Sequence, residues 1–405
     1  MKQEKPSVLA MNGGSSSIKF ALYEMSDRPQ RRLQGKVERI GLRDTTLTFD
    51  DPSRNQHDSR VIGDLDHRSA ANFVIDWLDQ HIGLTSIAAV GHRIVAGGAN
   101  DNEPQRVTPA LLDALRRSIA YAPKHLPSAI AVIDLLHERV PSLPQIVCFD
   151  TAFHRDMPRV ARILPIPRRL QALGVERYGF HGLSYAFLME ELARVAGAEA
   201  ALGRVILAHM GNGASLAAVR SGKSIDTSMG FTPTGGVPMG TRSGDLDPGL
   251  VWYLAQTEHM SAEQFHHMVN HESGLLGVSE TSSDLRDLLA HEADDVRAAE
   301  AVALFCYQIK KCIGAYAAAL GGLDTLVFAG GIGENAPVVR ARICEGLGFL
   351  GVEIDEKRNV ANAGVISADT GRVAVRVMHT DEEVMIAKSV CYVLEHSQNK
   401  DGPGS

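Results

Sequence analysis

The chain has 405 residues, of which 44% are hydrophobic and 22% are charged, and its formal net charge is −7. This composition excludes disorder over most of the length, and the acidic balance argues against a protein that binds nucleic acid. A chain of this length is expected to form two domains.

Short apolar runs that end near glycine, asparagine or aspartate predict eight strands. In chain order they cover residues 8–11, 20–23, 88–91, 146–149, 205–208, 215–219, 325–329 and 373–377. Apolar residues at helical spacing predict helices that include residues 111–119, 188–195 and 298–320. Strands that alternate with helices predict an α/β protein whose sheets are largely covered.

The sequence has no run of about 18 apolar residues, so we expect neither a membrane-spanning helix nor a membrane partner. The apolar stretch near the N-terminus is too short for a secretory signal. The five cysteines are widely separated, and their odd number and spacing predict neither a disulfide framework nor a zinc site. A reducing cytoplasm is therefore the expected location.

A short internal repeat links the two halves of the chain. Asn-Gly-Gly-Ser at residues 12–15 returns as Asn-Gly-Ala-Ser at residues 212–215, and each copy lies between two predicted strands. A four-residue match has little weight alone. Its position in equivalent surroundings nevertheless indicates a duplicated two-domain fold.

Three glycine-rich turns are predicted after strands, at residues 12–19, 209–215 and 330–336. Their backbone N–H groups could surround a phosphate, and Lys19 adds charge to the first of them. A plain hairpin turn is the alternative for the first two, and the residues alone leave it open. The third matches the G-x-G-x-x-A pattern of dinucleotide-binding proteins, which keeps an NAD-dependent oxidoreductase as a distant alternative.

Nine motifs in one order resemble those of the acetate kinase family, which includes propionate and butyrate kinases. They lie at residues 12–19, 91–95, 149–154, 177–182, 209–213, 239–248, 282–286, 331–335 and 380–383. The resemblance implies a duplicated actin-like (ribonuclease H-like) α/β fold, with a nucleotide cleft between its domains, and usually a homodimer. The first domain would comprise residues 1–150 with about 384–405, and the second residues 151–383.

The reaction that the resemblance implies is reversible, in-line phosphoryl transfer between ATP and acetate, which gives acetyl phosphate and ADP. Propionate and butyrate are the alternative acceptors, and the cofactor would be Mg²⁺, with Mn²⁺ as a substitute. The carboxylate substrate is already ionised at pH 7, so the enzyme needs no general base. It must instead hold two anions together and neutralise the moving phosphoryl group.

The resemblance also assigns catalytic and substrate-binding residues. Arg93 would bind the substrate carboxylate, for which a planar guanidinium is well suited. Arg242 and His181 would contact the phosphoryl group. Asp150 would be catalytic as well, and because the substrate has no proton to lose, we interpret its role as organising Mg²⁺, water or Arg93.

Three further sets of residues follow from the same resemblance. The apolar substrate pocket would contain Val95, Phe180 and Pro233, and the metal would bind Asn12 and Glu382. ATP would contact Ser15, Ser17, Lys19, His209, Gly211, Asn212, Gly213, Asp284, Leu285, Arg286, Gly331, Ile332, Gly333, Glu334 and Asn335. Residues 380–383 also match a capping box, in which Glu383 would cap a helix while Glu382 faces the metal.

The chain departs from the family pattern near the substrate pocket. Lys124 stands where leucine is usual, Ala96 and Tyr185 stand where histidine is common, and Asp381 replaces an asparagine beside the metal-site glutamate. The residues predicted for phosphoryl transfer are present, whereas the rim of the substrate pocket is atypical. The sequence therefore supports a carboxylate kinase more firmly than acetate as its substrate. A silent ATP-binding module of the same fold is a third alternative.

Overall fold

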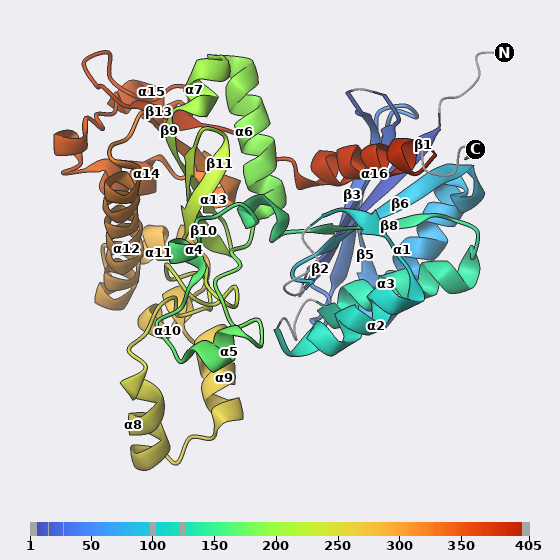
Figure 1. The fold of residues 1–405 in the computed structure, drawn as a ribbon, viewed down its shortest axis with the longest axis horizontal. Coiled ribbons are helices and arrows are strands. Elements are labelled where there is room, and N and C mark those ends of the chain that lie inside the picture. Colours follow the sequence, from blue (N-terminus) through green and yellow to red (C-terminus); the bar gives the residue numbers. More distant parts are fainter. Residues whose placement is uncertain (1–5, 15, 27, 98–102, 122–125, 399–405) are drawn as a thin grey trace. The chain divides into compact units, whose positions relative to one another are not determined.

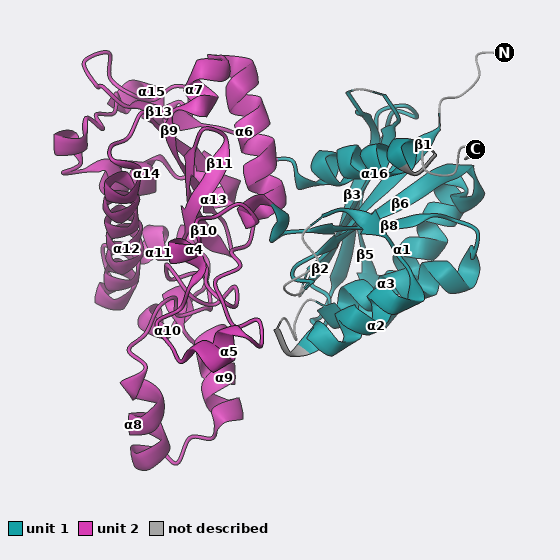
Figure 2. Ribbon diagram, viewed as in Figure 1, with its two compact units in different colours: residues 1–152, 381–405 teal, residues 153–380 magenta. Residues whose placement is uncertain are grey.

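The computed structural model describes residues 6–14, 16–26, 28–97, 103–121 and 126–398 (Figure 1). The chain divides into two compact units, which Figure 2 shows in separate colours. Unit 1 comprises residues 1–152 and 381–405, and unit 2 comprises residues 153–380. The chain thus returns to unit 1 at residue 381, so Glu382 belongs to unit 1.

Unit 1 contains an eight-stranded sheet in the order β5-β4-β3-β2-β1-β6-β8-β7. Its strands are β1 (Ser7–Gly13), β2 (Ser17–Glu24), β3 (Gln30–Glu38), β4 (Thr45–Asp51), β5 (Gln56–Gly63), β6 (Ile87–Ile94), β7 (Gln105–Arg106) and β8 (Gln145–Phe149). β1, β6 and β8 are parallel to one another, and the other neighbours are antiparallel. The carboxyl ends of these three strands therefore lie along one edge of the sheet.

Four helices belong to unit 1, within the residues that the structure describes. They are α1 (His67–Ile82), α2 (Pro109–Arg117), α3 (Leu126–Arg139) and α16 (Glu382–Gln398). In the core, Trp77 of α1 packs against Phe20 and Phe49, with ring centroids 5.4 and 4.7 Å apart. These aromatic contacts attach α1 to the antiparallel part of the sheet.

The C-terminal helix α16 packs against β1 and β6 (Figure 1). A Cβ atom on Gly91 of β6 would lie 2.4 Å from Ile386 and 2.6 Å from Val390. Only glycine therefore permits this close approach of helix and strand. The packing brings the first residues of α16 to the carboxyl ends of β1 and β6, although they are separated by most of the chain.

Unit 2 contains a five-stranded sheet in the order β11-β10-β9-β12-β13. Its strands are β9 (Arg204–Met210), β10 (Ala214–Arg220), β11 (Lys223–Thr227), β12 (Thr325–Ala329) and β13 (Ala374–Val377). β9, β12 and β13 are parallel to one another, whereas β10 is antiparallel to β9 and β11. Ala329 of β12 lies opposite His209 of β9, so the segments that follow these two strands emerge at the same edge.

Helices cover both faces of the sheet in unit 2, with α6 and α12 on opposite sides (Figure 1). The helices are α4 (Arg159–Arg162), α5 (Arg168–Gln171), α6 (Gly182–Ala196), α7 (Ala198–Leu202), α8 (Gly249–Thr257), α9 (Ala262–His271), α10 (Gly274–Ser279), α11 (Leu285–His291), α12 (Val296–Leu320), α13 (Gly330–Asn335), α14 (Pro337–Cys344) and α15 (Glu356–Val360). Leu188 and Leu192 of α6 pack on Val205 and Leu207 of β9 in one buried cluster.

All eight predicted strands are present, and the predicted α/β class is confirmed. The three predicted helices correspond to α2, α6 and α12. The third glycine-rich segment is not a turn, because β12 leads directly into α13 with Ala329 in an extended conformation as its N-cap. Within the described residues, no helix has the length and apolar character needed to cross a membrane.

Burial of His154 makes the stability of unit 2 depend on pH. Its Nε2 atom lies 3.0 Å from the carbonyl oxygen of Phe180 and its Nδ1 atom 2.8 Å from Ser224 Oγ. Burial lowers the pKa of His154 to about 4. In the unfolded chain a histidine has a pKa of about 6.5, so the unfolded state binds this proton first as the pH falls.

The contribution of neutral, buried His154 to the free energy of unfolding is therefore complete above about pH 6.5 and is lost as the pH falls toward 4. When the pH falls from 7 to 5, we expect protonation of His154 in the unfolded state to lower the free energy of unfolding by about 2 kcal/mol. Urea unfolding of the wild type and of His154→Gln at both pH values measures this term. The variant should lose about 2 kcal/mol less than the wild type, and equal losses would contradict the assignment.

Candidate active site

Unit 1 brings three predicted site residues together at the carboxyl ends of its parallel strands. Asn12 lies near the end of β1, Arg93 near the end of β6, and Asp150 directly after β8. Arg93 donates from Nε and Nη2 to Asp150 Oδ2, at 3.0 and 2.5 Å, and from Nη1 to Asn12 Oδ1 at 3.0 Å. Asp150 is fully buried, and the side chain of Arg93 is 15% exposed.

The acidic surroundings keep Arg93 charged. Burial alone would lower the pKa of Arg93, but the charges of Asp150 and Glu382 act against it and raise the pKa above its usual value. Glu382 Oε2 lies 3.8 Å from Arg93 Nε. Hydrogen bonds to Asp150 and Asn12 occupy three of the five guanidinium N–H groups. Two N–H groups of this fixed, charged guanidinium form no hydrogen bond to a described residue, and they can donate to an external carboxylate.

The first residues of α16 supply carboxylates beside Asn12. Asn12 Nδ2 donates to Glu382 Oε2 at 2.9 Å and to Glu383 Oε1 at 3.0 Å. The capping-box interpretation is wrong, because Asp381 Oδ1 accepts the N–H of Val384 and so caps the helix, while Glu383 turns toward Asn12. Asp381 also accepts the hydroxyl hydrogen bond of Tyr23 at 3.2 Å.

The two adjacent carboxylates fit a divalent cation. Burial and the neighbouring charge of Glu382 raise the pKa of Glu383 above its usual range. Mg²⁺ commonly binds through one or two carboxylates together with substrate phosphates, and Glu382 and Glu383 offer these oxygens. The side-chain oxygen Oδ1 of Asn12 accepts from Arg93, and its Nδ2 donates to both glutamates and orients them. Direct ligation of the metal by Asn12 stays a prediction. The described residues include no group of three or more acidic, histidine or cysteine ligands.

Unit 2 brings a second group of predicted residues together around the turn between β9 and β10. A Cβ atom on Gly213 would lie 2.6 Å from Arg242 Nη2 and 3.3 Å from His181 Nε2. The side chains of Arg242 and His181 therefore meet over Gly213, and a larger residue there would displace the guanidinium. Arg242 Nη1 donates to the carbonyl oxygen of Pro233 at 2.7 Å. Pro233, predicted as part of the apolar pocket, thus holds Arg242 through its backbone.

Two sets of the predicted nucleotide residues belong to the helices α11 and α13 of unit 2 or cap them. Asp284 caps α11 by accepting the N–H of Arg286, and the two side chains form an ion pair at 2.5 Å. Residues 331–335 lie within α13, which begins at the same sheet edge as the turn that contains residues 211–213. Glu334 accepts the N–H of Gly330 at 3.0 Å and pairs with His379 at 2.8 Å. It therefore stabilises the start of α13.

The remaining predicted residues are divided between the units. Lys19 of β2 lies opposite Asn12 in the strand register, and Ser17 begins the same strand. Val95 is buried in unit 1, whereas Phe180 is buried in unit 2. Ser15 and Lys124 lie outside the described residues.

Sequence analysis missed Arg340 of α14, which is fully buried. Its five N–H groups are all bonded. They donate to Gly333 O, Glu334 O, Asn359 Oδ1, Asn359 O and Asn362 Oδ1 at 2.6–3.0 Å. The guanidinium therefore binds the carbonyl groups of Gly333 and Glu334, near the C-terminal end of α13. The sequence around Arg340 carries no signal for this role, because the partners of the guanidinium are backbone and amide oxygens.

We expect Arg340→Lys to destabilise unit 2 by about 3 kcal/mol, since lysine offers three donors to a buried cage of five acceptors. The KM for ATP should rise several-fold, because α13 carries five of the predicted nucleotide residues. Arg342→Lys is the matched control, because Arg342 forms a partly exposed ion pair with Glu292. Thermal unfolding and ATP titration measure both effects, and equal behaviour of the two variants would disprove the role of Arg340.

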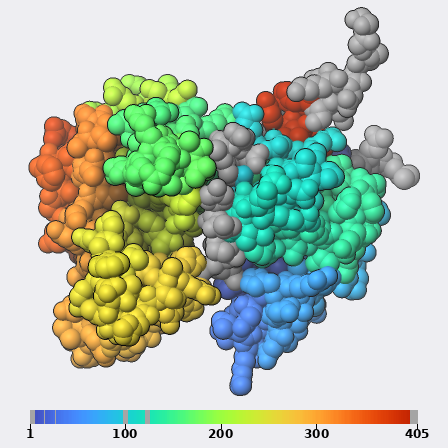
Figure 3. Space-filling model, turned by 60° about the horizontal axis from the view of Figure 1, so that its bottom comes forward, coloured from blue at the N-terminus to red at the C-terminus, as the bar shows by residue number. Residues whose placement is uncertain are grey.

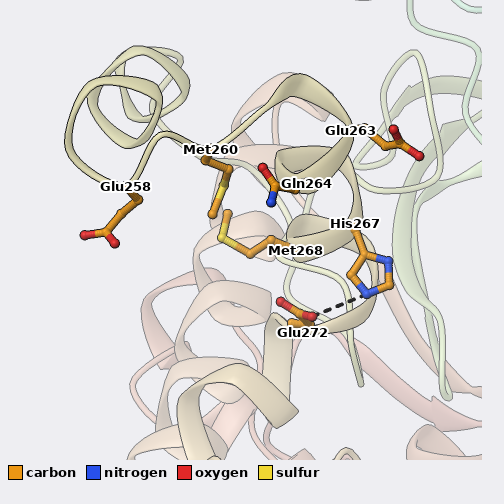
Figure 4. Close-up of a pocket in the computed structure, with 7 residues that line it drawn as sticks. All are labelled: Glu258, Met260, Glu263, Gln264, His267, Met268 and Glu272. Atoms are coloured by element: carbon orange, nitrogen blue, oxygen red, sulfur yellow. Dashed lines mark ion pairs between the residues drawn. The ribbon is translucent and has the colours of Figure 1, made fainter.

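A cavity of about 450 Å³ on unit 2 contains none of the predicted residues (Figure 4). It is lined by Glu258, Met260, Glu263, Gln264, His267, Met268 and Glu272. The imidazole of His267 faces Glu272, with 3.3 Å between His267 Nε2 and Glu272 Oε1. An acidic surface hollow of this kind is not suited to ATP or to a carboxylate.

Within unit 1 the predicted residues for the carboxylate and the metal lie together, and within unit 2 those for the phosphoryl group do. A sequence model of the acetokinase family matches residues 7–388. The chain belongs to this family, and it is a phosphotransferase with a carboxyl group as acceptor. The oxidoreductase alternative is therefore wrong.

Relatives of two substrate classes match over nearly the whole chain. An acetate kinase of Rhodopseudomonas palustris is 44% identical, and the match covers 95% of this chain and 97% of that one. A propionate kinase of Citrobacter rodentium is 43% identical, and the match covers 95% of this chain and 96% of that one. A crystal structure of a propionate kinase from Francisella tularensis superposes with a TM-score of 0.88 at 34% identity, covering 95% and 98%. The solved relatives share the actin-like fold that the motifs implied.

Proposed function

We propose that this chain is a Mg²⁺-dependent acetate kinase that transfers the γ-phosphoryl group of ATP reversibly and directly to acetate, giving acetyl phosphate and ADP. The observation that carries the proposal is Arg93, a charged guanidinium fixed by Asp150 and Asn12. Two of its N–H groups form no hydrogen bond to a described residue and can donate to a carboxylate. Propionate is an alternative acceptor, because the relatives named for acetate and for propionate are 44% and 43% identical to this chain. Butyrate is a further alternative.

Each side chain has a simple part in this proposal. Arg93 binds and orients the carboxylate, and Asp150 holds Arg93 instead of removing a proton. Arg242 and His181 donate hydrogen bonds to the phosphoryl oxygens as negative charge develops there. Glu382 and Glu383 would hold Mg²⁺, which would supply positive charge to neutralise the phosphates of ATP. ATP supplies the phosphoryl group. We therefore propose that the enzyme acts in the cytoplasm, where ATP is available.

ADP formation with acetate, propionate, butyrate or no acid tests the proposal. We expect ADP only when an acid and Mg²⁺ or Mn²⁺ are both present, with the highest kcat/KM for acetate. A higher kcat/KM for propionate or butyrate would correct the substrate but keep the enzyme class. ADP formation that is independent of any acid would contradict the proposed reaction.

We also infer that the enzyme is a homodimer. Val251, Trp252 and Tyr253 of α8 are 43%, 71% and 60% exposed, and no residue of this helix is buried. The segment around α8 lies at the surface of unit 2, in the yellow part of Figure 3. Monomers rarely leave such large apolar side chains together in water, which supports a second copy as their cover.

The molar mass in solution should therefore be twice the 43.7 kDa of the chain. Trp252→Glu should lower it to that of the monomer, because a charge would be buried in the interface. Tyr392→Glu, at a similarly exposed aromatic residue of unit 1, should leave the dimer intact. Light scattering coupled to gel filtration measures all three, and a monomeric wild type would refute the inference.

A further inference from the structure

The imidazole of His181 is attached on its inner side to a chain of hydroxyl groups. His181 Nδ1 lies 2.8 Å from Ser215 Oγ, and Ser215 Oγ is hydrogen-bonded to the hydroxyl of Tyr185. Tyr185 and Ser215 are fully buried, and His181 is 9% exposed. Tyr185 lies one helical turn after His181, and its backbone N–H donates to the carbonyl oxygen of His181 at 3.0 Å. Two elements, α6 and β10, thus fix one side of the ring.

The other side of the imidazole faces the turn between β9 and β10. His181 Nε2 would lie 3.3 Å from a Cβ atom on Gly213, next to Arg242 Nη2. The neighbouring ring of His209, 4.4 Å away between centroids, also has its Nδ1 atom on a hydroxyl, that of Ser184 at 2.8 Å. Both imidazoles are therefore held at Nδ1 by uncharged hydroxyls.

The partners of an imidazole decide which nitrogen carries its proton. A neutral imidazole has one N–H donor and one acceptor nitrogen. A phenol is more acidic than a serine hydroxyl and is the better donor, so the direction Tyr185 to Ser215 is favoured. Ser215 then gives its only proton to His181 Nδ1, and the ring proton resides on Nε2. A carboxylate in place of Ser215 would instead bind an Nδ1–H and stabilise the imidazolium.

We propose that Tyr185, acting through Ser215, is a positioning residue that holds His181 as the neutral tautomer with its proton on Nε2. This inference rests on the proposed function, because it makes His181 a hydrogen-bond donor to the phosphoryl group beside Arg242. His181 then contributes a donor without transferring a proton to the substrate. It also gives a role to Tyr185, a residue at which this chain departs from its family pattern.

Nitrogen NMR of the full-length protein labelled with ¹⁵N-histidine reports the tautomer directly. His181→Gln identifies the His181 signals by their loss. In the wild type at pH 7.5 we expect His181 as the Nε2–H tautomer alone. Ser215→Ala should give a mixture of the two tautomers, and Tyr185→Phe a smaller shift in the same direction. Tyr178→Phe is the matched control, because it removes a phenol that bonds Gly174 O instead, and it should leave the tautomer unchanged.

Steady-state kinetics provide the second measurement. Tyr185→Phe should lower kcat about tenfold with the KM for ATP within about twofold, as expected when a partner behind a contacting residue is removed. Tyr185→His, which restores a ring donor, should recover part of kcat. If Tyr185→Phe does not fold, Ser215→Ala carries the test, because alanine fits the space of serine.

A His181 that stays entirely Nε2–H in Ser215→Ala would overturn the proposal. A tautomer that shifts while kcat is unchanged would also overturn it, because the positioning would then have no effect on transfer. If the wild type shows no acid-dependent turnover but the tautomer shifts as expected, the proposed function fails while the hydroxyl chain still sets the tautomer. The two failures are therefore distinguishable.

Discussion

Arg242→Ala is expected to lower kcat about a thousandfold, while the KM for ATP changes by less than about threefold. An arginine that contacts the transferring phosphoryl group stabilises mainly the transition state, and its removal commonly costs 10³ or more in rate. Arg242 is well placed for this part, since the carbonyl oxygen of Pro233 holds one guanidinium nitrogen and the other lies over Gly213 beside His181. Initial rates at saturating acetate and varied ATP measure both constants.

Two further variants define the origin of this loss. Arg242→Lys should recover little activity, because an ammonium is a point charge and cannot reproduce two parallel N–H groups. Arg194→Ala is the control, because Arg194 forms an exposed ion pair with Glu191 on the outer part of unit 2. It should keep the wild-type kcat. If Arg242→Ala raised the KM for ATP and left kcat unchanged, Arg242 would only bind ATP in the ground state and would not take part in phosphoryl transfer.

Arg93→Ala is expected to raise the KM for acetate about a hundredfold and to destabilise unit 1 by about 3–5 kcal/mol. The first effect follows from the loss of two charged hydrogen bonds to the carboxylate. The second follows because Asp150 is fully buried and would lose its counter-charge. Acetate titration at saturating ATP measures the first effect, and urea unfolding measures the second.

The double variant Arg93→Met with Asp150→Asn separates the two effects. It removes both charges together, so most of the lost stability should return. The KM for acetate should stay high, because methionine offers no donor. Recovery of acetate binding in the double variant would show that Arg93 acts only as a structural partner of Asp150.

The fold was largely predictable because its central strands are short apolar runs. β6, β8, β9 and β12 are buried on both faces, which gives a nearly continuous hydrophobic signal. The strands that the sequence analysis missed have another pattern. β4 alternates buried and partly buried residues, and β5 is mostly exposed at the sheet edge. Their polar residues resemble those of a loop unless the alternation of apolar and polar positions is taken into account.

The site was predictable only as far as its motifs reach. Motif order indicated Arg93, Asp150, His181 and Arg242, and the structure groups the first two in unit 1 and the last two in unit 2. Which atoms meet could not be predicted, because the partners come from distant segments. Glu383 illustrates this limit, since local spacing favoured a helix cap but contact with Asn12, 371 residues away, determines its orientation.

Chemical identification of the product tests the central claim most directly. The wild type is incubated with Mg²⁺, ATP and acetate in the presence of hydroxylamine, which converts an acyl phosphate to a stable hydroxamate. We predict acetyl hydroxamate in an amount equal to the ADP formed, and none from Arg242→Ala over the same time. ADP formed together with inorganic phosphate and without hydroxamate would contradict transfer to the carboxyl group.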